Sequence, residues 1–147
     1  VEEHVATLPG LDGRKMSKSY DNTIALFEGG AKKLHAAIRR IVTDSRVPGE
    51  PKDAENSQLY AIYRAFAAAD EAARFRAELE DGLGWGPAKD RLYQLIESEL
   101  APMRERYETL IARPDDIDDV LLDGARKARA IAVPFMEQLR AAVGLRG

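Results

Sequence analysis

The sequence predicts an all-α protein, a helical bundle of five or six helices that follows a flexible basic loop. Three observations support this. From about residue 30 onward, apolar residues recur at spacings of three and four, the period of a helix with one buried face. No stretch shows the alternation of apolar and polar residues that marks a strand. Glycine, proline and serine separate the periodic stretches and stand where helices begin or end.

Residues 5–23 are predicted to form the loop, because proline and glycine interrupt any helical period there. A helix follows Gly29-Gly30. Residues 46–56 form a connector, and Ser57 is a suitable N-cap for the next helix. Asp70 is the expected cap of a third helix, which ends near Gly82. The apolar residues expected to face the core from these helices are Leu34, Ile38, Ile41, Leu59, Tyr60, Ile62, Tyr63, Phe66, Phe75 and Leu79.

Two longer helices are predicted in the second half. The first starts around Gly84-Trp85-Gly86-Pro87, and Pro102 should kink or split it. The last begins at Asp115 or Asp116, bends at Pro134 and ends at Gly144. Their expected inward residues are Leu92, Leu95, Ile96, Met103, Tyr107 and Leu110, then Ile117, Val120, Leu121, Ala125 and Ala128.

Composition excludes several classes of protein. With 147 residues and a 45% apolar share, the chain can build one core. It has no cysteine, so disulfides and thiolate metal sites are excluded. No apolar run approaches the roughly 18 residues that span a membrane. The first residues do not resemble a signal peptide, and the start at Val1 suggests part of a longer protein. We therefore expect a cytoplasmic location.

Charge is distributed unevenly along the chain, although the net charge is only −3. Basic residues outnumber acidic ones in 13–46 and in 124–147, whereas acidic residues dominate 47–123. A phosphate group needs only a local positive field, because salt screens charges beyond about 8–10 Å. Ordinary solvated helix faces explain the same distribution, so charge alone does not decide between them.

The most informative stretch is Lys15-Met16-Ser17-Lys18-Ser19. Lysine ammonium groups neutralise phosphate oxygens, and serine hydroxyls and loop amides add hydrogen bonds. Such a loop suits a reaction in which negative charge grows on leaving pyrophosphate. It is not a P-loop, because the G-x-x-x-x-G-K-[ST] pattern cannot be aligned. A basic solvent loop remains the alternative for five residues taken alone.

The longer stretch from Leu8 to Asn22 resembles the KMSKS loop of class I aminoacyl-tRNA synthetases, without substitution in the five-residue motif. The tail Tyr-Asp-Asn-Thr-Ile is similar to the bacterial tryptophanyl branch, whereas tyrosyl relatives usually carry a degenerate loop. The resemblance continues over nearly the whole chain, through segments at 41–45, 50–53, 84–86, 105–107 and 122–125.

This resemblance implies a role in the ATP-dependent, AMP-forming ligation of tryptophan to tRNA. It implies that Lys18 contacts the departing pyrophosphate and that Lys15 lies beside it, so these two are the expected catalytic residues. The implied ATP-binding residues are Lys15, Met16, Ser17, Lys18 and Ser19. Mg²⁺ accompanies the ATP in the full-length enzyme, with no metal held by this chain's own ligands. L-tryptophan binds through a part that is not in this chain.

The family resemblance also implies two domains. Residues 1–29 would be the KMSKS-loop segment at the edge of a missing catalytic domain, because neither His4 nor His35 fits the His-x-Gly-His signature of that domain. Residues 30–147 would be a helical domain of the anticodon-binding type, with tRNA(Trp) as partner. Full-length members of the family are expected to be homodimers. The fragment alone is expected to be inactive.

Other candidate residues carry weaker signals. Arg126, Lys127 and Arg129 could meet tRNA phosphates, although a solvated helix face explains them as well. Trp85 could stack on a base, although a core position is the plainer interpretation. The acidic cluster at 115–119 complements a helix dipole better than it predicts a metal site. The alternative function is a stand-alone helical RNA-binding or interaction module without catalysis. The intact motif favours the ligase.

Overall fold

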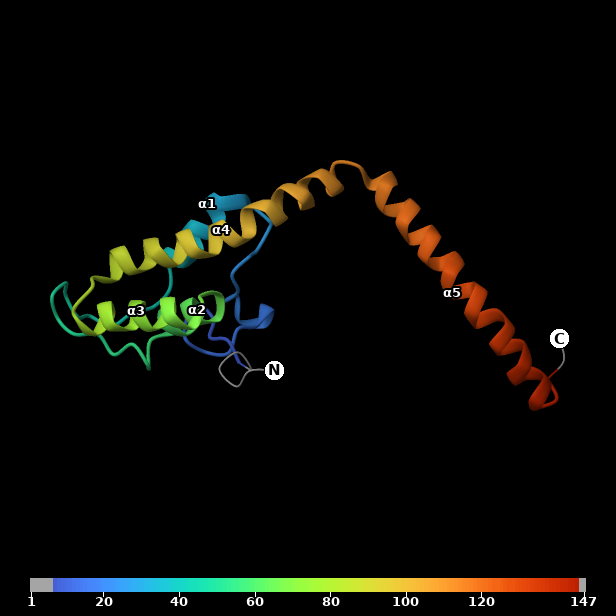
Figure 1. Cartoon of the computed structure of the whole chain (residues 1–147), viewed down its shortest axis with the longest axis horizontal. Coiled ribbons are helices and arrows are strands. Elements are labelled where there is room, and N and C mark those ends of the chain that lie inside the picture. The colour runs from blue at the N-terminus through green and yellow to red at the C-terminus, as the bar shows by residue number, and fades with distance from the viewer. Residues whose placement is uncertain (1–6, 146–147) are drawn as a thin grey trace. The chain divides into compact units, whose positions relative to one another are not determined.

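Five α-helices follow the loop in the computed structural model, which describes residues 7–145. They are α1 (Gly30–Arg39), α2 (Gln58–Phe66), α3 (Ala69–Glu80), α4 (Trp85–Ile111) and α5 (Pro114–Ala142) (Figure 1). Within the described residues there is no strand, and one isolated antiparallel bridge joins Pro9 to Lys15. The prediction of an all-α fold is confirmed. His4 lies outside the described residues.

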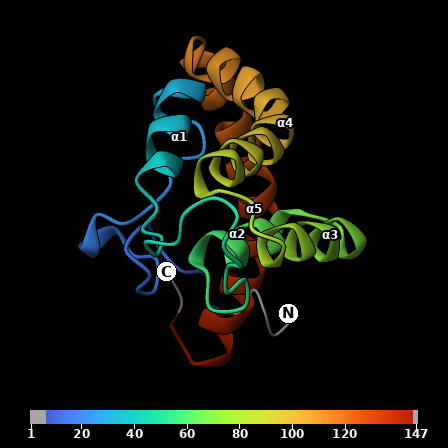
Figure 2. The same ribbon diagram turned by 90° about the vertical axis from the view of Figure 1, so that its left-hand side faces the viewer.

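The chain divides into two compact units, residues 1–105 and residues 106–147. The hydrophobic core lies in the first unit, where α1 lies to one side of α4, and α2 and α3 lie to another (Figures 1 and 2). Each helix contributes residues at helical spacing, so the apolar period read from the sequence corresponds to real buried faces. The core residues contributed by the helices are Leu34, Ile38, Leu59, Tyr60, Ile62, Tyr63, Phe75, Leu79, Ala88, Leu92, Ile96 and Leu100.

The start of α2 follows the sequence prediction, whereas the start of α3 does not. The Ser57 hydroxyl accepts a hydrogen bond from the Tyr60 amide, as expected of an N-cap. Asp70 is not the cap of α3, because the helix begins earlier and its N-cap is Ala68. Asp70 lies in the first turn instead, where its carboxylate complements the positive end of the helix dipole. Gly82, with a φ of 100°, follows the end of this helix as predicted.

An aromatic group joins α2 to α3. Phe75 is fully buried and stacks on Tyr63, with ring centroids 3.9 Å apart, and lies 6.4 Å from the ring of Tyr60. The Tyr63 hydroxyl donates to Glu71 at 3.0 Å, and burial together with this carboxylate raises the pKa of Tyr63 to about 12. Phe66 is 36% exposed, so its predicted core position is wrong, because it is the last residue of α2.

Helix α4 continues through Pro102 rather than splitting there. Proline lacks the N–H that the carbonyl of Ser98 would accept, so one backbone bond is lost. A partly buried ion pair spans this position: both terminal guanidinium nitrogens of Arg104 donate to Glu97, at 2.7 and 2.9 Å. The hydrogen bonds from Arg104 hold the pKa of the Glu97 carboxyl below its ordinary value. On the same helix Met103 is 52% exposed. Its spacing had predicted an inward position, and that prediction is wrong.

The predicted connector between α1 and α2 is organised around a buried lysine. Lys52 is only 2% exposed, and its ammonium group donates to the carbonyl oxygens of Val47, at 2.7 Å, and of Glu50. The backbone N–H of Lys52 donates to the Leu79 carbonyl at 2.9 Å, which ties the connector to the end of α3. The connector is therefore an ordered part of the first unit.

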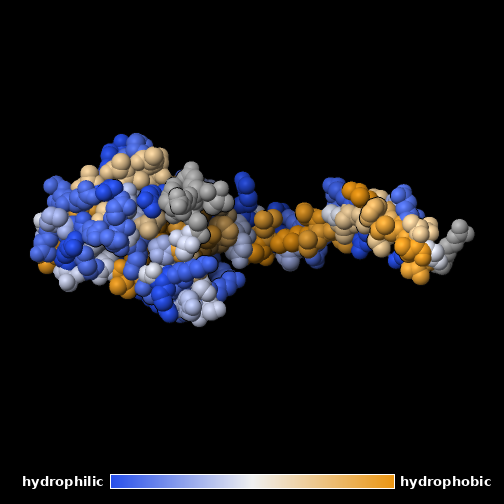
Figure 3. Space-filling model, turned by 90° about the horizontal axis from the view of Figure 1, so that it is seen from below, coloured by the Kyte–Doolittle hydropathy of each residue, from blue (hydrophilic) through white to orange (hydrophobic). Residues whose placement is uncertain are grey.

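The second unit consists of the end of α4 and helix α5. No residue of α5 is buried, so the prediction that Ile117, Val120 and Leu121 face inward is wrong for this chain. The physical reason is that a long helix buries an apolar stripe only against other elements, and the rest of its unit is only the short end of α4. Hydrophobic side chains consequently lie exposed along α5, as the orange atoms of Figure 3 show.

Candidate functional site

The loop that carries the two lysines is closed by backbone hydrogen bonds. The amide of Met16 donates to the Leu8 carbonyl at 3.0 Å, and the amide of Gly10 donates to the Arg14 carbonyl at 2.7 Å. Gly13 has a φ of 84°, the left-handed conformation that permits this tight reversal. The sequence predicted a flexible loop without helical period, and these hydrogen bonds give that loop a defined backbone path. Its mobility remains a prediction.

The five motif residues lie on the outside of this reversal. Lys15 and Lys18 are exposed, and within residues 7–145 neither ammonium group forms an ion pair. Ser17 is half-buried, and its hydroxyl accepts from the Ser19 amide at 3.3 Å, which caps a 3₁₀ turn at Lys18–Tyr20. Met16 is half-buried. Lys15 and Lys18 are thus available for an anion, which is the property that the motif predicts.

Asn22 holds the loop from inside. It is only 2% exposed, and its side-chain oxygen accepts from the Ser17 amide at 2.8 Å. Its side-chain nitrogen donates to Asp12 Oδ1 at 2.7 Å and to the Lys15 carbonyl at 3.2 Å. Its own backbone carbonyl accepts from the Leu11 amide at 2.9 Å. Asn22 ends the stretch that carries the family resemblance, but the sequence alone indicated no role for it.

Arg14, the third cation of the loop, is already engaged. It pairs with Asp12 at 2.6 Å, and its guanidinium lies over the ring of Tyr20, 4.4 Å from the centroid. The hydrogen bond from Asn22 has the largest influence on Asp12. Together with Arg14 it lowers the pKa of that carboxyl, against the opposing effect of burial. Arg14 therefore differs from the two motif lysines, which remain unpaired in the described part of the chain.

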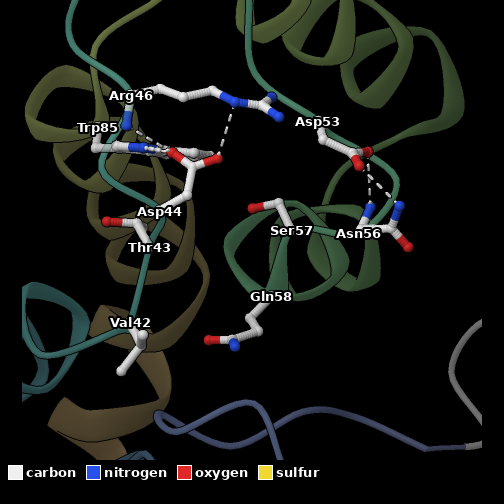
Figure 4. A pocket seen from close by; sticks show the side chains of 9 residues that line it. All are labelled: Val42, Thr43, Asp44, Arg46, Asp53, Asn56, Ser57, Gln58 and Trp85. Carbon is white, nitrogen blue, oxygen red and sulfur yellow. Dashed lines mark hydrogen bonds and ion pairs between the residues drawn. The ribbon is translucent and has the colours of Figure 1, made fainter.

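A second feature is an open pocket of about 340 Å³ between the residues that follow α1 and the starts of α2 and α4 (Figure 4). Its walls are mainly polar. The lining residues are Val42, Thr43, Asp44, Arg46, Asp53, Asn56, Ser57, Gln58 and Trp85.

Trp85 and Asp44 form one wall of this pocket. The indole N–H donates to Asp44 Oδ1 at 2.8 Å, and Arg46 lies 3.5 Å from the other carboxylate oxygen (Figure 4). Partial burial raises the pKa of the Asp44 carboxyl, but the hydrogen bonds from Trp85 and from the Arg46 amide outweigh it and lower the pKa overall. Trp85 also packs against the core, so it serves in part as the core residue that sequence analysis expected.

Gln58 contributes an unpaired acceptor to the same pocket. Its side-chain oxygen is buried and has no hydrogen-bond partner in the described residues. A buried acceptor without a partner is costly, and a ligand with a donor group at this point would relieve that cost. The sequence alone did not indicate a role for Gln58, because nothing in its neighbours distinguishes it from any polar residue in the first turn of a helix.

The predicted phosphate-contacting residues of α5 lie on its exposed surface. Arg126 and Lys127 both pair with Asp123, at 3.3 and 2.6 Å, while Arg129 is exposed. His35, the other histidine that sequence analysis examined, is 43% exposed on α1 and lies 3.7 Å from Asp90. It is a surface residue, as expected.

Metal-binding side-chain clusters and membrane-spanning helices are the two other features considered for residues 7–145. No group of three or more histidine, cysteine, aspartate or glutamate side chains between residues 7 and 145 is gathered so that it could hold a metal ion. None of the helices described here combines the length and the apolar character needed to cross a bilayer.

Known proteins resemble this chain over nearly its whole length. Tryptophan–tRNA ligases from Pseudomonas aeruginosa and Bordetella parapertussis are 64% and 63% identical, and each alignment covers 99% of this chain and 32% of the relative. The crystal structure of tryptophanyl-tRNA synthetase from Campylobacter jejuni, complexed with ADP and tryptophan, matches with a TM-score of 0.89 at 38% identity. That match covers 99% of this chain and 46% of the other. No protein-family model matches.

The loop that carries the intact Lys15–Ser19 motif and the helices that follow it define part of a class I aminoacyl-tRNA synthetase. The chain spans about a third of the length of the curated relatives it matches. Within that class, it belongs with the tryptophan–tRNA ligases.

Proposed function

We propose that this chain supplies the pyrophosphate-binding loop for the activation of L-tryptophan by ATP in a tryptophan–tRNA ligase. The observation that carries the proposal is a pair of exposed lysines, Lys15 and Lys18, which form no ion pair with any residue from 7 to 145 and lie on a loop closed by internal hydrogen bonds. The similarity to tryptophan–tRNA ligases supports it, and so does the Campylobacter jejuni protein, whose crystals hold ADP and tryptophan. The stand-alone binding module is the less favoured alternative, because it has no need of such a loop.

In the proposed reaction, a carboxylate oxygen of tryptophan attacks the α-phosphorus of ATP and pyrophosphate leaves. The bond from the α-phosphorus to the bridging oxygen breaks, so negative charge grows on the leaving group. Lys18 would contact that group and Lys15 would lie beside it, while Ser17 and Ser19 would give hydrogen bonds to phosphate oxygens. Met16 backbone would lie near the adenine. These ammonium groups would act most strongly where the charge develops.

Magnesium would accompany the ATP phosphates rather than bind to this loop. Mg²⁺ prefers carboxylate and water oxygens in octahedral geometry, whereas the loop presents ammonium groups and hydroxyls. The loop carboxylate of Asp12 is already paired with Arg14 and Asn22, and no group of three or more histidine, cysteine, aspartate or glutamate side chains gathers in the described part of the loop. The residues of this loop therefore do not fit a magnesium site.

The loop proposal can be tested by titrating the 147-residue chain with inorganic pyrophosphate and following backbone amide shifts by NMR. We expect weak binding, with the largest shifts at residues 15–19, because two unpaired lysines attract phosphate even without catalysis. Lys18→Ala should weaken this binding about 3–10-fold. The matched control is Lys32→Ala, which removes an exposed lysine from α1. Equal effects of the two substitutions would show that pyrophosphate binds the basic surface without a specific site.

We also propose that residues 30–147 form a tRNA-binding domain and that residues 1–29 belong to the edge of the catalytic domain of the full-length enzyme. The pocket at Trp85 supports the first part, because an indole face and an unpaired acceptor suit a single unstacked base with a donor group. The exposed basic residues Arg126, Lys127 and Arg129 would contribute phosphate contacts. Homodimerisation and a cytoplasmic location would follow from the same function.

The binding of tRNA(Trp) by the chain tests the pocket. Gln58→Leu removes the unpaired acceptor and should weaken binding about 5–30-fold, the cost of losing one specific hydrogen bond. Gln94→Leu is the matched control, because Gln94 is exposed on α4. Replacing the three basic residues of α5 by alanine should instead reduce the salt dependence of binding. Identical affinities of the two glutamine variants would rule out the pocket as a base-binding site.

A further inference from the structure

Asn22 is a buried polar residue in a loop whose other polar side chains are largely exposed. It is 2% exposed, while the flanking Asp21 and the motif lysines are open to solvent. A buried carboxamide is stable only when its donors and acceptor are satisfied, and all of them are used here. The helical core does not require this arrangement, because every side-chain hydrogen bond of Asn22 ends within the loop.

The partners of Asn22 lie on both sides of Met16. The Asn22 oxygen accepts from the amide of Ser17, and the nitrogen donates to the carbonyl of Lys15. Two peptide groups of the motif are thereby held by one side chain. Ser17 is also the N-cap of the turn in which Lys18 lies, so the same hydrogen bond determines where that turn begins. The directions in which Lys15 and Lys18 leave the backbone depend on these contacts.

Two neighbouring residues keep Asn22 in place. Asp12 accepts from the Asn22 nitrogen, and the low pKa of its carboxyl keeps that acceptor ionised well below neutral pH. Gly10 leaves room for the carboxamide, because a Cβ at this position would lie 2.3 Å from Asn22 Cγ and 2.7 Å from the Asn22 carbonyl oxygen. Asp12 and Gly10 therefore provide a hydrogen-bond acceptor and enough space for one asparagine side chain in the loop.

We propose that Asn22 is a positioning residue for the pyrophosphate-binding lysines. By holding the Lys15 carbonyl and the Ser17 amide, it sets the geometry in which Lys18 meets the leaving group. This inference rests on the proposed function of the loop. A small displacement of a catalytic group costs rate rather than substrate affinity, so the expected signature is a fall in the activation rate with little change in the tryptophan KM.

The experiment uses a chimeric ligase in which this chain replaces the matching third of the Pseudomonas aeruginosa enzyme. Asn22→Ala should lower the rate of tryptophan activation about 10–100-fold and leave the KM for tryptophan within about twofold. Gln94→Ala is the control. Gln94 carries the same carboxamide group as Asn22, but it is exposed on α4, outside the loop and outside the pocket at Trp85. The rate of the Gln94→Ala chimera should remain close to that of the unsubstituted chimera.

A double-variant cycle separates positioning from general stability. If Asn22 acts through Lys18, then Asn22→Ala combined with Lys18→Ala should be hardly slower than Lys18→Ala alone. Asn22→Asp places a carboxylate against Asp12 and should be slow, and adding Asp12→Asn should restore part of the rate. Circular dichroism should show unchanged helix content. If Asn22→Ala loses helix content, Asp12→Ala takes its place in the cycle, with the same expected outcome.

Three results would be decisive against parts of this account. Equal rates for Asn22→Ala and Gln94→Ala would overturn the role of Asn22. Fully additive losses from Asn22 and Lys18 would do the same, because they would show that Asn22 acts elsewhere. An unchanged rate in Lys18→Ala would instead overturn the proposed function of the loop, whatever the effect of Asn22.

Discussion

Lys18→Ala in the chimeric ligase is expected to slow tryptophan activation by about 10²–10³-fold, which corresponds to roughly 3–4 kcal/mol of lost transition-state stabilisation. The reason is that Lys18 is exposed and unpaired in the described part of the chain, so its ammonium group is available to the charge that develops on pyrophosphate. Tryptophan affinity should change little, because the proposed function assigns the pocket for that substrate to another part of the enzyme. Single-turnover kinetics, with tryptophan binding measured separately, check this result.

Lys15→Ala provides the comparison within the same loop. It removes an identical group from the proposed outer position and should therefore cost less than Lys18→Ala. Neither substitution should reduce the stability of the helical unit, because both side chains are exposed. A rate loss in Lys18→Ala that arose wholly from abolished tryptophan binding would contradict the proposed role of this lysine.

Phe75→Ala in the 147-residue chain is expected to lower the free energy of unfolding by about 3–5 kcal/mol. Phe75 is fully buried, and its ring stacks on Tyr63 where α2 meets α3. Its removal loses apolar burial and leaves a cavity that two fixed helices cannot close. Because domains of this size are stable by only about 5–15 kcal/mol, urea-induced unfolding should shift to much lower denaturant concentration.

Phe135→Ala is the matched control for that substitution. Phe135 lies on α5 and is 58% exposed, so its loss should change the free energy of unfolding by no more than about 0.5 kcal/mol. A loss below about 1 kcal/mol in Phe75→Ala would be incompatible with the core described for α2 and α3.

The sequence was sufficient to predict the helices of the first unit, because their apolar period has neighbours to pack against. Leu34, Ile38 and Phe75 are buried as their spacing predicted. The same rule failed for α5, where Ile117 and Val120 are exposed. A helical period indicates that a face is apolar, but burial also requires a second element, which the period does not supply.

Local chemistry explains the other differences. Asp70 has the right side chain for an N-cap, but the helix begins one residue earlier at Ala69, and Asp70 complements the helix dipole from the first turn. In the loop, the five-residue motif could be recognised directly from its residues. The role of Asn22 could not, because its partners Asp12 and Ser17 are brought to it only by the backbone reversal. Gln58 was missed for the same reason: its unpaired oxygen is a property of the folded pocket.

Tryptophan-dependent exchange of pyrophosphate into ATP is the most direct test of the central claim that this chain supplies one essential part of a tryptophan-activating site. The isolated 147-residue chain should show exchange at background level, because the proposed function assigns the positioning of tryptophan and the α-phosphate to another part of the enzyme. The chimera that contains the chain should show clear exchange with tryptophan, and Lys18→Ala should remove most of it. Exchange well above background from the isolated chain would contradict this account, and so would a folded chimera that exchanges equally well with and without Lys18.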